Sequence, residues 1–104
     1  MVRRLAAAAV VRALEAAEQL VEEQPDGFGI DAVGLLTVPR PIAARVVRDL
    51  MYRLEAAPTQ ESIEAVLDLA AGRPGRRRDL AAGLVASRDS GYVSLSRTSP
   101  ESRV

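Results

Sequence analysis

The sequence contains no cysteine and no histidine. The first absence excludes disulfide bonds and thiol nucleophiles, and the second excludes imidazole acid–base chemistry. Together they remove the ligands on which nearly all zinc and iron sites depend, so a metal would have to bind carboxylates alone. We therefore expect no metal site in this chain.

Aromatic residues and lysine are also scarce. Aromatic residues make up 3% of the 104 residues and hydrophobic residues 48%, so the core has to be built from Leu, Val, Ile and Ala packed by shape. All 14 basic residues are Arg, a bias that a GC-rich genome explains as readily as guanidinium chemistry does. A chain of this length is expected to fold as one domain with a modest core.

Long hydrophobic runs are missing as well. No stretch approaches the roughly 18 consecutive apolar residues that a membrane-spanning helix needs. The N-terminal stretch MVRRLAAAAVVRALEAAEQ begins like a signal peptide, but Arg12 and Glu15 interrupt its apolar run and no cleavage site follows. We interpret it as a helix and expect a cytoplasmic protein that does not contact membranes.

The formal net charge is zero, but the charges are segregated along the chain. Residues 1–31 contain three Arg and six acidic residues, whereas residues 71–104 contain seven Arg and three acidic residues. A basic C-terminal part favours a polyanionic partner, although a solvated polar surface has the same composition.

Hydrophobic periodicity predicts three helices. The first covers residues 3–24, and the central one, within residues 35–54, has an apolar half-cylinder and starts near Pro39 and Pro41. The third follows Thr59, a predicted N-cap, and ends near Gly72. The predicted inner residues are Ile42, Ala43, Val46, Val47, Leu50, Met51 and Leu54 in the central helix, and Ile63, Val66, Leu67 and Ala70 in the third.

Beyond the third helix the pattern becomes alternating. The segments RRRDL, GLVAS and YVSLS are separated by Ala81-Ala82-Gly83 and Asp89-Ser90-Gly91, which predicts a three-strand meander. In its last strand we expect Val93 and Leu95 to face the helices, and we expect Phe28 to plug the edge of the core. The predicted fold class is α+β, mainly α, with three helices followed by a small antiparallel three-strand meander.

Catalytic motifs are not found in the sequence. There is no Gly-rich phosphate loop, no nucleophile beside a base and no metal-ligand spacing. Acidic pairs such as Glu61 with Glu64 are typical of solvated helix faces. We expect no catalytic residues and no enzymatic activity in this chain alone.

Two groups of residues suit a nucleic acid. The first lies on the polar face of the central helix, where guanidinium groups contact phosphates and an aromatic ring stacks on a base. The alternative for this group is an ordinary polar face that Asp49 and Glu55 neutralise. The second group, which includes Arg73, lies where the chain enters the meander and on the adjacent strand. The candidate nucleic-acid-binding residues are Arg45, Arg48, Tyr52, Arg76, Arg77, Arg78 and Arg88.

The order of these segments resembles a known family. The segments LLTVPRPIAARVVRDLMYRL, TQESIEAVLDLAAGRPG and RRRDLAAGLVASRDSGYVSLSR are similar to the region that follows the catalytic domain in bacterial tRNA(Ile)-lysidine synthases. That region has a Leu-Pro step, an Arg-rich helix, a second helix ending at Gly, and a short sheet that begins Asp-Leu-x-x-Gly. The chain departs from this pattern at Ala43, Ala44 and Asp49, where the family is often basic, and at Ala81-Ala82, where it has Pro-Gly.

The resemblance implies a tRNA-binding, substrate-positioning domain. It divides the chain into a lead-in linker helix (residues 1–27), a helical plus β-meander accessory domain (residues 28–97) and a flexible tail (residues 98–104). The family consists of ATP-dependent carbon–nitrogen ligases that attach lysine to the wobble cytidine of the CAU-anticodon isoleucine tRNA. Its Ser-Gly-Gly-x-Asp-Ser motif is not in this chain, so ATP, Mg and lysine would belong to a separate catalytic domain. The implied partners are tRNA and that catalytic domain.

Two other functions remain open from the sequence. Three helices followed by a basic hairpin also occur in winged-helix DNA-binding regulators, although here the third helix contains Glu61, Glu64 and Asp68 and no basic residue. The other alternative is a protein-interaction module whose Ala-rich first helix docks on a partner.

Overall fold

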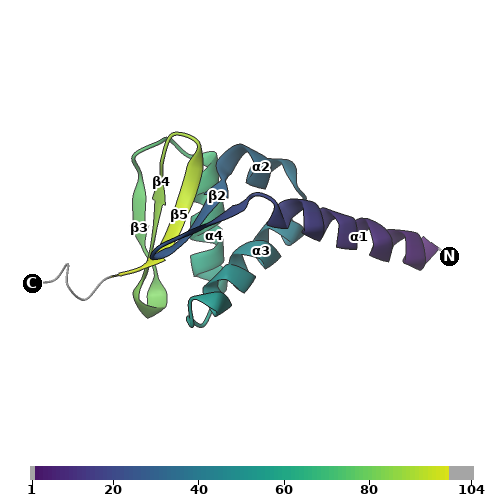
Figure 1. Ribbon diagram of the computed structural model, residues 1–104, viewed down its shortest axis with the longest axis horizontal. Helices are drawn as coiled ribbons and strands as arrows, with labels where there is room; N and C mark the ends of the chain where they lie inside the picture. Colours follow the sequence, from purple (N-terminus) through teal and green to yellow (C-terminus); the bar gives the residue numbers. More distant parts are fainter. Residues whose placement is uncertain (1, 99–104) are drawn as a thin grey trace, which may run out of the picture.

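The fold consists of one antiparallel sheet with helices packed on one of its faces, while the N-terminal helix extends away from the sheet (Figure 1). The computed structural model describes residues 2–98, with side chains from residue 8 onward. These residues form, in order, α1 (Val2–Glu18), β1 (Val21–Gln24), β2 (Gly27–Asp31), α2 (Ala32–Thr37), α3 (Arg40–Arg53), α4 (Gln60–Ala71), β3 (Arg77–Asp79), the 3-10 turn Ala81–Gly83, β4 (Leu84–Arg88) and β5 (Tyr92–Arg97).

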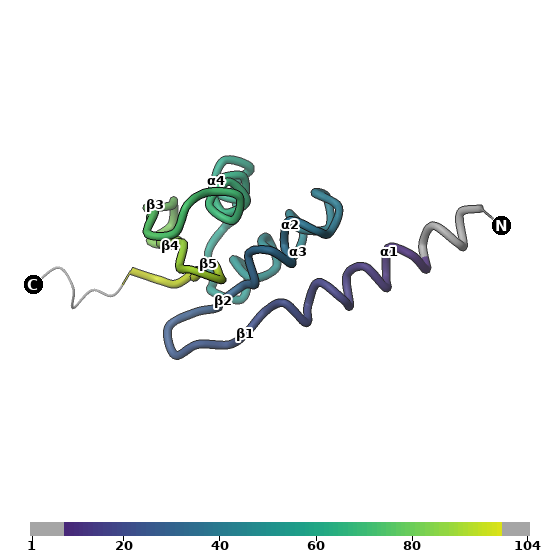
Figure 2. The backbone as a smooth tube through the Cα atoms, turned by 90° about the horizontal axis from the view of Figure 1, so that it is seen from above, coloured from purple at the N-terminus to yellow at the C-terminus, as the bar shows by residue number. Residues whose placement is uncertain are grey.

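The sheet combines strands from the N-terminal part and the C-terminal part of the chain, because β2 pairs with β5. Its strand order is β1-β2-β5-β4-β3, and every neighbouring pair is antiparallel. Phe28 of β2 lies opposite Leu95 of β5, and Ile30 lies opposite Val93. The two edge strands are β1 and β3, and Figure 2 shows β3 beside α4 and far from β1.

The hydrophobic core lies between the inner face of the sheet and the helices. Ile30, Val93 and Leu95 alternate with outward residues along their strands and are fully buried. Phe28 is buried on the same face, and the guanidinium carbon of Arg53 lies 4.6 Å from the centre of its ring. The prediction that Phe28 plugs the edge of the core is therefore confirmed, and a cation–π contact covers it.

Helix α3 forms the centre of the helical layer, as its periodicity predicts. Pro39 is its N-cap, and Pro41 occupies the first turn, where a missing N–H removes no helical hydrogen bond. Leu54, predicted on the inner face, is half-buried at the C-cap. The other predicted inner residues are all buried: Ile42, Ala43, Val46, Val47, Leu50 and Met51.

Helix α4 also matches its prediction. The Thr59 hydroxyl accepts a hydrogen bond from the backbone N–H of Ser62 at 3.0 Å, so Thr59 is the N-cap. Glu61 lies in the first turn, where the helix dipole favours a negative charge, and Gly72 is the C-cap. The predicted inner residues Ile63, Val66, Leu67 and Ala70 are buried.

The α+β class is correct, but the predicted element count is not. The described residues contain four α-helices and a five-stranded sheet instead of three helices and three strands. The predicted helix at residues 3–24 ends at Glu18, because Val21 begins β1 and lies opposite Ile30 in a hairpin. The strands β3, β4 and β5 do form the predicted meander, as one half of the larger sheet.

The fourth helix is α2, which precedes α3. Asp31 caps it, because its Oδ1 accepts a hydrogen bond from the backbone N–H of Gly34 at 2.9 Å. Val38 then adopts an extended conformation, with φ −87° and ψ 155°, as a residue before proline prefers. The prolines therefore separate α2 from α3.

The predicted lead-in segment contributes to the same sheet and core as the rest of the chain. Strand β1 pairs with β2, while α1 packs on α3 through the buried side chain of Ala17 and the half-buried side chain of Leu14. Of the predicted tail, residues 99–104 lie outside the described residues. No helix in the described part of the chain is both long and apolar enough to cross a membrane.

Candidate nucleic-acid interface

Strand β3 brings arginines to the free edge of the sheet beside α4. Arg78 lies opposite the buried Ala86 of β4, so its side chain is on the helix-facing side of the sheet. The backbone oxygen of Arg76 accepts a hydrogen bond from the N–H of Arg88 at 2.7 Å, which places Arg76 on the same side as Arg78. Arg77 alternates with them and pairs with Asp79, with 3.7 Å between Nη2 and Oδ1.

A groove separates α4 from β3. A hollow of about 490 Å³ lies at its basic end, and a second hollow of about 210 Å³ lies towards the start of α4, with Arg78 bordering both. We call the whole feature the α4–β3 groove. The basic end is lined by Asp68, Leu69, Ala71, Gly72, Arg73, Arg76, Arg77 and Arg78, and the other end by Thr59, Glu61, Ser62, Ala65, Arg78, Asp79, Leu80 and Ala81.

The arginines of the groove are available to an anion. Arg73, Arg76, Arg77 and Arg78 are all exposed, and of these four only Arg77 forms an ion pair with a residue of the described part of the chain. Arginines gathered around one hollow raise the local potential more than the same charges spread over a convex surface. The groove therefore suits a phosphate-bearing ligand.

The other predicted group lies on the outer face of α3. Arg45, Arg48 and Tyr52 are exposed there, and 62% of Tyr52 is accessible to solvent. Neither arginine forms an ion pair within residues 8–98, for which side chains are described. Asp49 is exposed next to Arg48, and Glu55 is exposed just beyond the C-terminal end of the helix. Acidic side chains therefore follow the two arginines along the chain.

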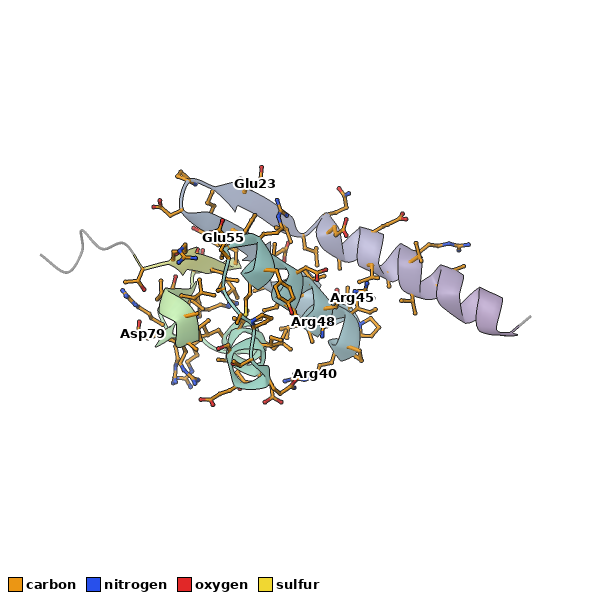
Figure 3. All side chains as sticks on the ribbon, turned by 90° about the horizontal axis from the view of Figure 1, so that it is seen from below. Glu23, Arg40, Arg45, Arg48, Glu55 and Asp79 are labelled. Carbon is orange, nitrogen blue, oxygen red and sulfur yellow. The ribbon has the colours of Figure 1, made fainter. Side chains whose placement is uncertain are left out.

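The two arginine groups do not form one surface. Figure 3 shows Arg40, Arg45 and Arg48 on α3, with Asp79 of β3 on the far side of α4. The exposed residues of α4 that lie between the two groups include Glu61, Glu64 and Asp68. The sequence assigns both groups to nucleic-acid binding but does not place them relative to each other, since the position of α4 between them follows only from the topology.

Arg88 lies in a different environment from the other candidate residues. Only 9% of its surface is exposed, because it follows Leu84 and Ala86 on the inner face of β4. Its Nη1 donates a hydrogen bond to the backbone oxygen of Asp89, and its Nε has no partner among the described residues. Arg88 therefore lies behind Arg76, where it adds positive charge but does not line the groove.

The described residues contain no cluster of three or more His, Cys, Asp or Glu side chains arranged to hold a metal ion. Comparison of the sequence with protein-family models and with curated proteins gives no match. The resemblance to the lysidine synthases therefore stays a prediction from the sequence pattern.

Proposed function

We propose that this chain is an RNA-binding accessory domain of the tRNA(Ile)-lysidine synthase type, which holds tRNA for a separate catalytic domain. The observation that carries the proposal is the α4–β3 groove, in which four arginines line one cavity. Arg presents a planar fork of N–H donors that matches the oxygens of a phosphate group. The groove therefore supplies phosphate contacts that fix the position of an RNA without reading its sequence.

The resemblance to the lysidine synthases is the reason for proposing tRNA as the RNA that binds. The two walls of the groove come from the segments TQESIEAVLDLAAGRPG and RRRDL, which both belong to the part of the chain that is similar to the lysidine synthases. In this proposal ATP, Mg and lysine bind to the catalytic domain, and the present chain contributes substrate positioning only. Its partners are tRNA and that catalytic domain.

A fluorescence anisotropy titration tests RNA binding. The chain is titrated against CAU-anticodon isoleucine tRNA, a second tRNA and duplex DNA, each at two salt concentrations. We expect tRNA to bind more tightly than duplex DNA and its affinity to decrease with salt, because phosphate contacts release counterions. Arg76→Ala should weaken binding, whereas Arg12→Ala, which removes the same charge from α1, should not. Equal binding of all three nucleic acids, or none, would contradict the proposal.

The accessory-domain part of the proposal has its own test. The coding DNA upstream of Met1 should contain an in-frame stretch that encodes Ser-Gly-Gly-x-Asp-Ser. An intergenic promoter at that place would contradict a link to the catalytic domain. The anisotropy titration would still decide whether the groove binds RNA.

A protein-interaction module is the second candidate function. The observation that favours it is the exposure of Val10 and Val11 on α1, at 43% and 51% of their surfaces. Sedimentation equilibrium of the chain tests it, since an apolar docking helix should promote association. A monomer with an ordered α1 would contradict this alternative. A winged-helix role is less well supported, because α4 would present acidic side chains to the bases.

A further inference from the structure

The two walls of the α4–β3 groove have opposite charge. Arginines dominate the β3 wall, whereas the exposed side of α4 carries Glu61, Glu64 and Asp68. Glu61 and Asp68 line opposite ends of the groove, and Glu64 is exposed between them on the same helix. None of the three forms an ion pair with an arginine of residues 8–98. We call these residues the acidic rim.

We infer that the α4–β3 groove accepts a single RNA strand and that the acidic rim rejects a duplex. This inference rests on the proposed RNA-binding function and adds the strandedness of the ligand. It also gives the three acids of α4 a role in selectivity, which the phosphate contacts of the arginines do not provide.

The spacing of the arginines fits one backbone. Arg76 and Arg78 are two residues apart and on the same side of the sheet. Two residues of an extended strand span roughly 7 Å. Neighbouring phosphates along one nucleic-acid strand have a similar separation, so one strand that follows β3 places successive phosphates at Arg76 and Arg78. Arg88 behind Arg76 makes that position the more positive of the two.

A duplex and a single strand present different chemical groups to the acidic rim. Its second backbone carries a further row of phosphates, which would meet the carboxylates of Glu61 and Asp68 in the groove. Like charges at such an interface lower affinity, and specific interfaces use this repulsion to exclude wrong partners. A single strand presents base edges to the rim instead, and the amino groups of cytosine and adenine donate hydrogen bonds to carboxylates.

The test compares a short labelled RNA with the same RNA annealed to its complement, by anisotropy at low salt. The single strand should bind about tenfold more tightly than the duplex, because only the duplex meets the rim with phosphates. Neutralising the two acids that line the groove with Glu61→Gln and Asp68→Asn should raise duplex affinity about tenfold and single-strand affinity only about twofold. Glu15→Gln with Glu18→Gln removes the same charge from α1 and should change both affinities alike.

The outcomes distinguish selectivity for single-stranded RNA from RNA binding itself. Equal affinity of the unchanged chain for single strand and duplex would overturn the inference but leave the proposed RNA binding in place. An equal gain for both RNAs after neutralising the rim would also overturn it, because the acids would then act through net charge alone. Failure of both RNAs to bind would overturn the proposed function and, with it, this inference.

Discussion

The outer face of α3 and the α4–β3 groove carry the same type of basic residue and differ in their surroundings. On α3, Arg45 and Arg48 project from a convex helix surface next to Asp49. In the groove, Arg76 and Arg78 line an open hollow whose other wall is the end of α4. The number of arginines does not distinguish the two regions, but the shape of the surface does.

This difference has a physical basis in the dielectric. Two unit charges 4 Å apart interact by about 1 kcal/mol in bulk water and by about 4 kcal/mol at the effective dielectric constant of a protein surface. A phosphate on α3 would remain surrounded by water, whereas a phosphate in the groove loses part of its water to protein walls and meets several guanidinium groups at once. A dense run of arginine therefore becomes a site only where the fold gives it a facing wall.

The largest effect should come from the inner face of α3, which contrasts with its outer face. Met51 is fully buried, and its neighbour Tyr52 is 62% exposed. Met51→Ala should lower the free energy of unfolding by about 3 kcal/mol, because it leaves a cavity in the core. Tyr52→Ala should change it by less than about 0.5 kcal/mol. Urea denaturation measures both, and a large loss for Tyr52→Ala would show that the outer face has a structural role.

The helices that line the candidate site were predictable because each carries its own signals. The inner residues of α3 and α4 repeat at the helical period, and Pro39 and Thr59 mark their starts. The strands β1 and β2 lack such signals. Residues 21–24 contain one apolar residue, and β2 contains Gly27, where a Cβ atom would lie 2.0 Å from the backbone oxygen of Leu95. Glycine is needed there for close strand packing, but in the sequence it resembles a turn.

The second largest effect should come from the groove arginines, and the matching substitutions on α3 allow the two arginine groups to be compared directly. Arg76→Ala with Arg78→Ala should reduce single-stranded RNA affinity about 100-fold, or about 2.8 kcal/mol. The salt dependence should weaken by about 1.4 units of log K per log salt, which corresponds to two lost phosphate contacts. Arg45→Ala with Arg48→Ala removes the same charge from α3 and should cost about twofold. Anisotropy titrations measure all of these, and a larger loss from the α3 pair would reverse the comparison.

The arginines of the candidate site were only partly predictable. Arg76, Arg77 and Arg78 are consecutive, so their proximity follows from the sequence alone, but the wall that α4 supplies depends on the sheet order. The burial of Arg88 did have a signal, because it continues the alternation of Leu84 and Ala86. The charge of Arg88 favours an exposed position, but the residue is buried as the alternation of the strand predicts.

A smaller effect should separate Arg88 from the exposed arginines of the groove. Its Nε is buried without a partner in the described structure, and a buried charge without compensation lowers stability. Arg88→Met keeps the apolar stem and removes the charge, so it should raise the free energy of unfolding by about 1 kcal/mol. Arg78→Met at an exposed position should stay within about 0.5 kcal/mol of the unchanged chain. A marked loss of stability in Arg88→Met, measured by urea denaturation, would show that its hydrogen bond to Asp89 is needed for the hairpin.

The smallest expected effect decides whether shape or net charge distinguishes the two surfaces. Asp49→Asn with Glu55→Gln removes the exposed acid of α3 and the exposed acid just beyond its C-terminal end, and leaves Arg45 and Arg48 without a neighbouring carboxylate. If the concave wall of the groove is the decisive feature, RNA affinity should rise by no more than about threefold, since two exposed charges act on the ligand through water. An anisotropy titration at low salt measures this change under the conditions where screening is weakest and the effect is therefore largest. A tenfold gain that Arg45→Ala then abolishes would mean that α3 is a second binding surface held inactive by its acids.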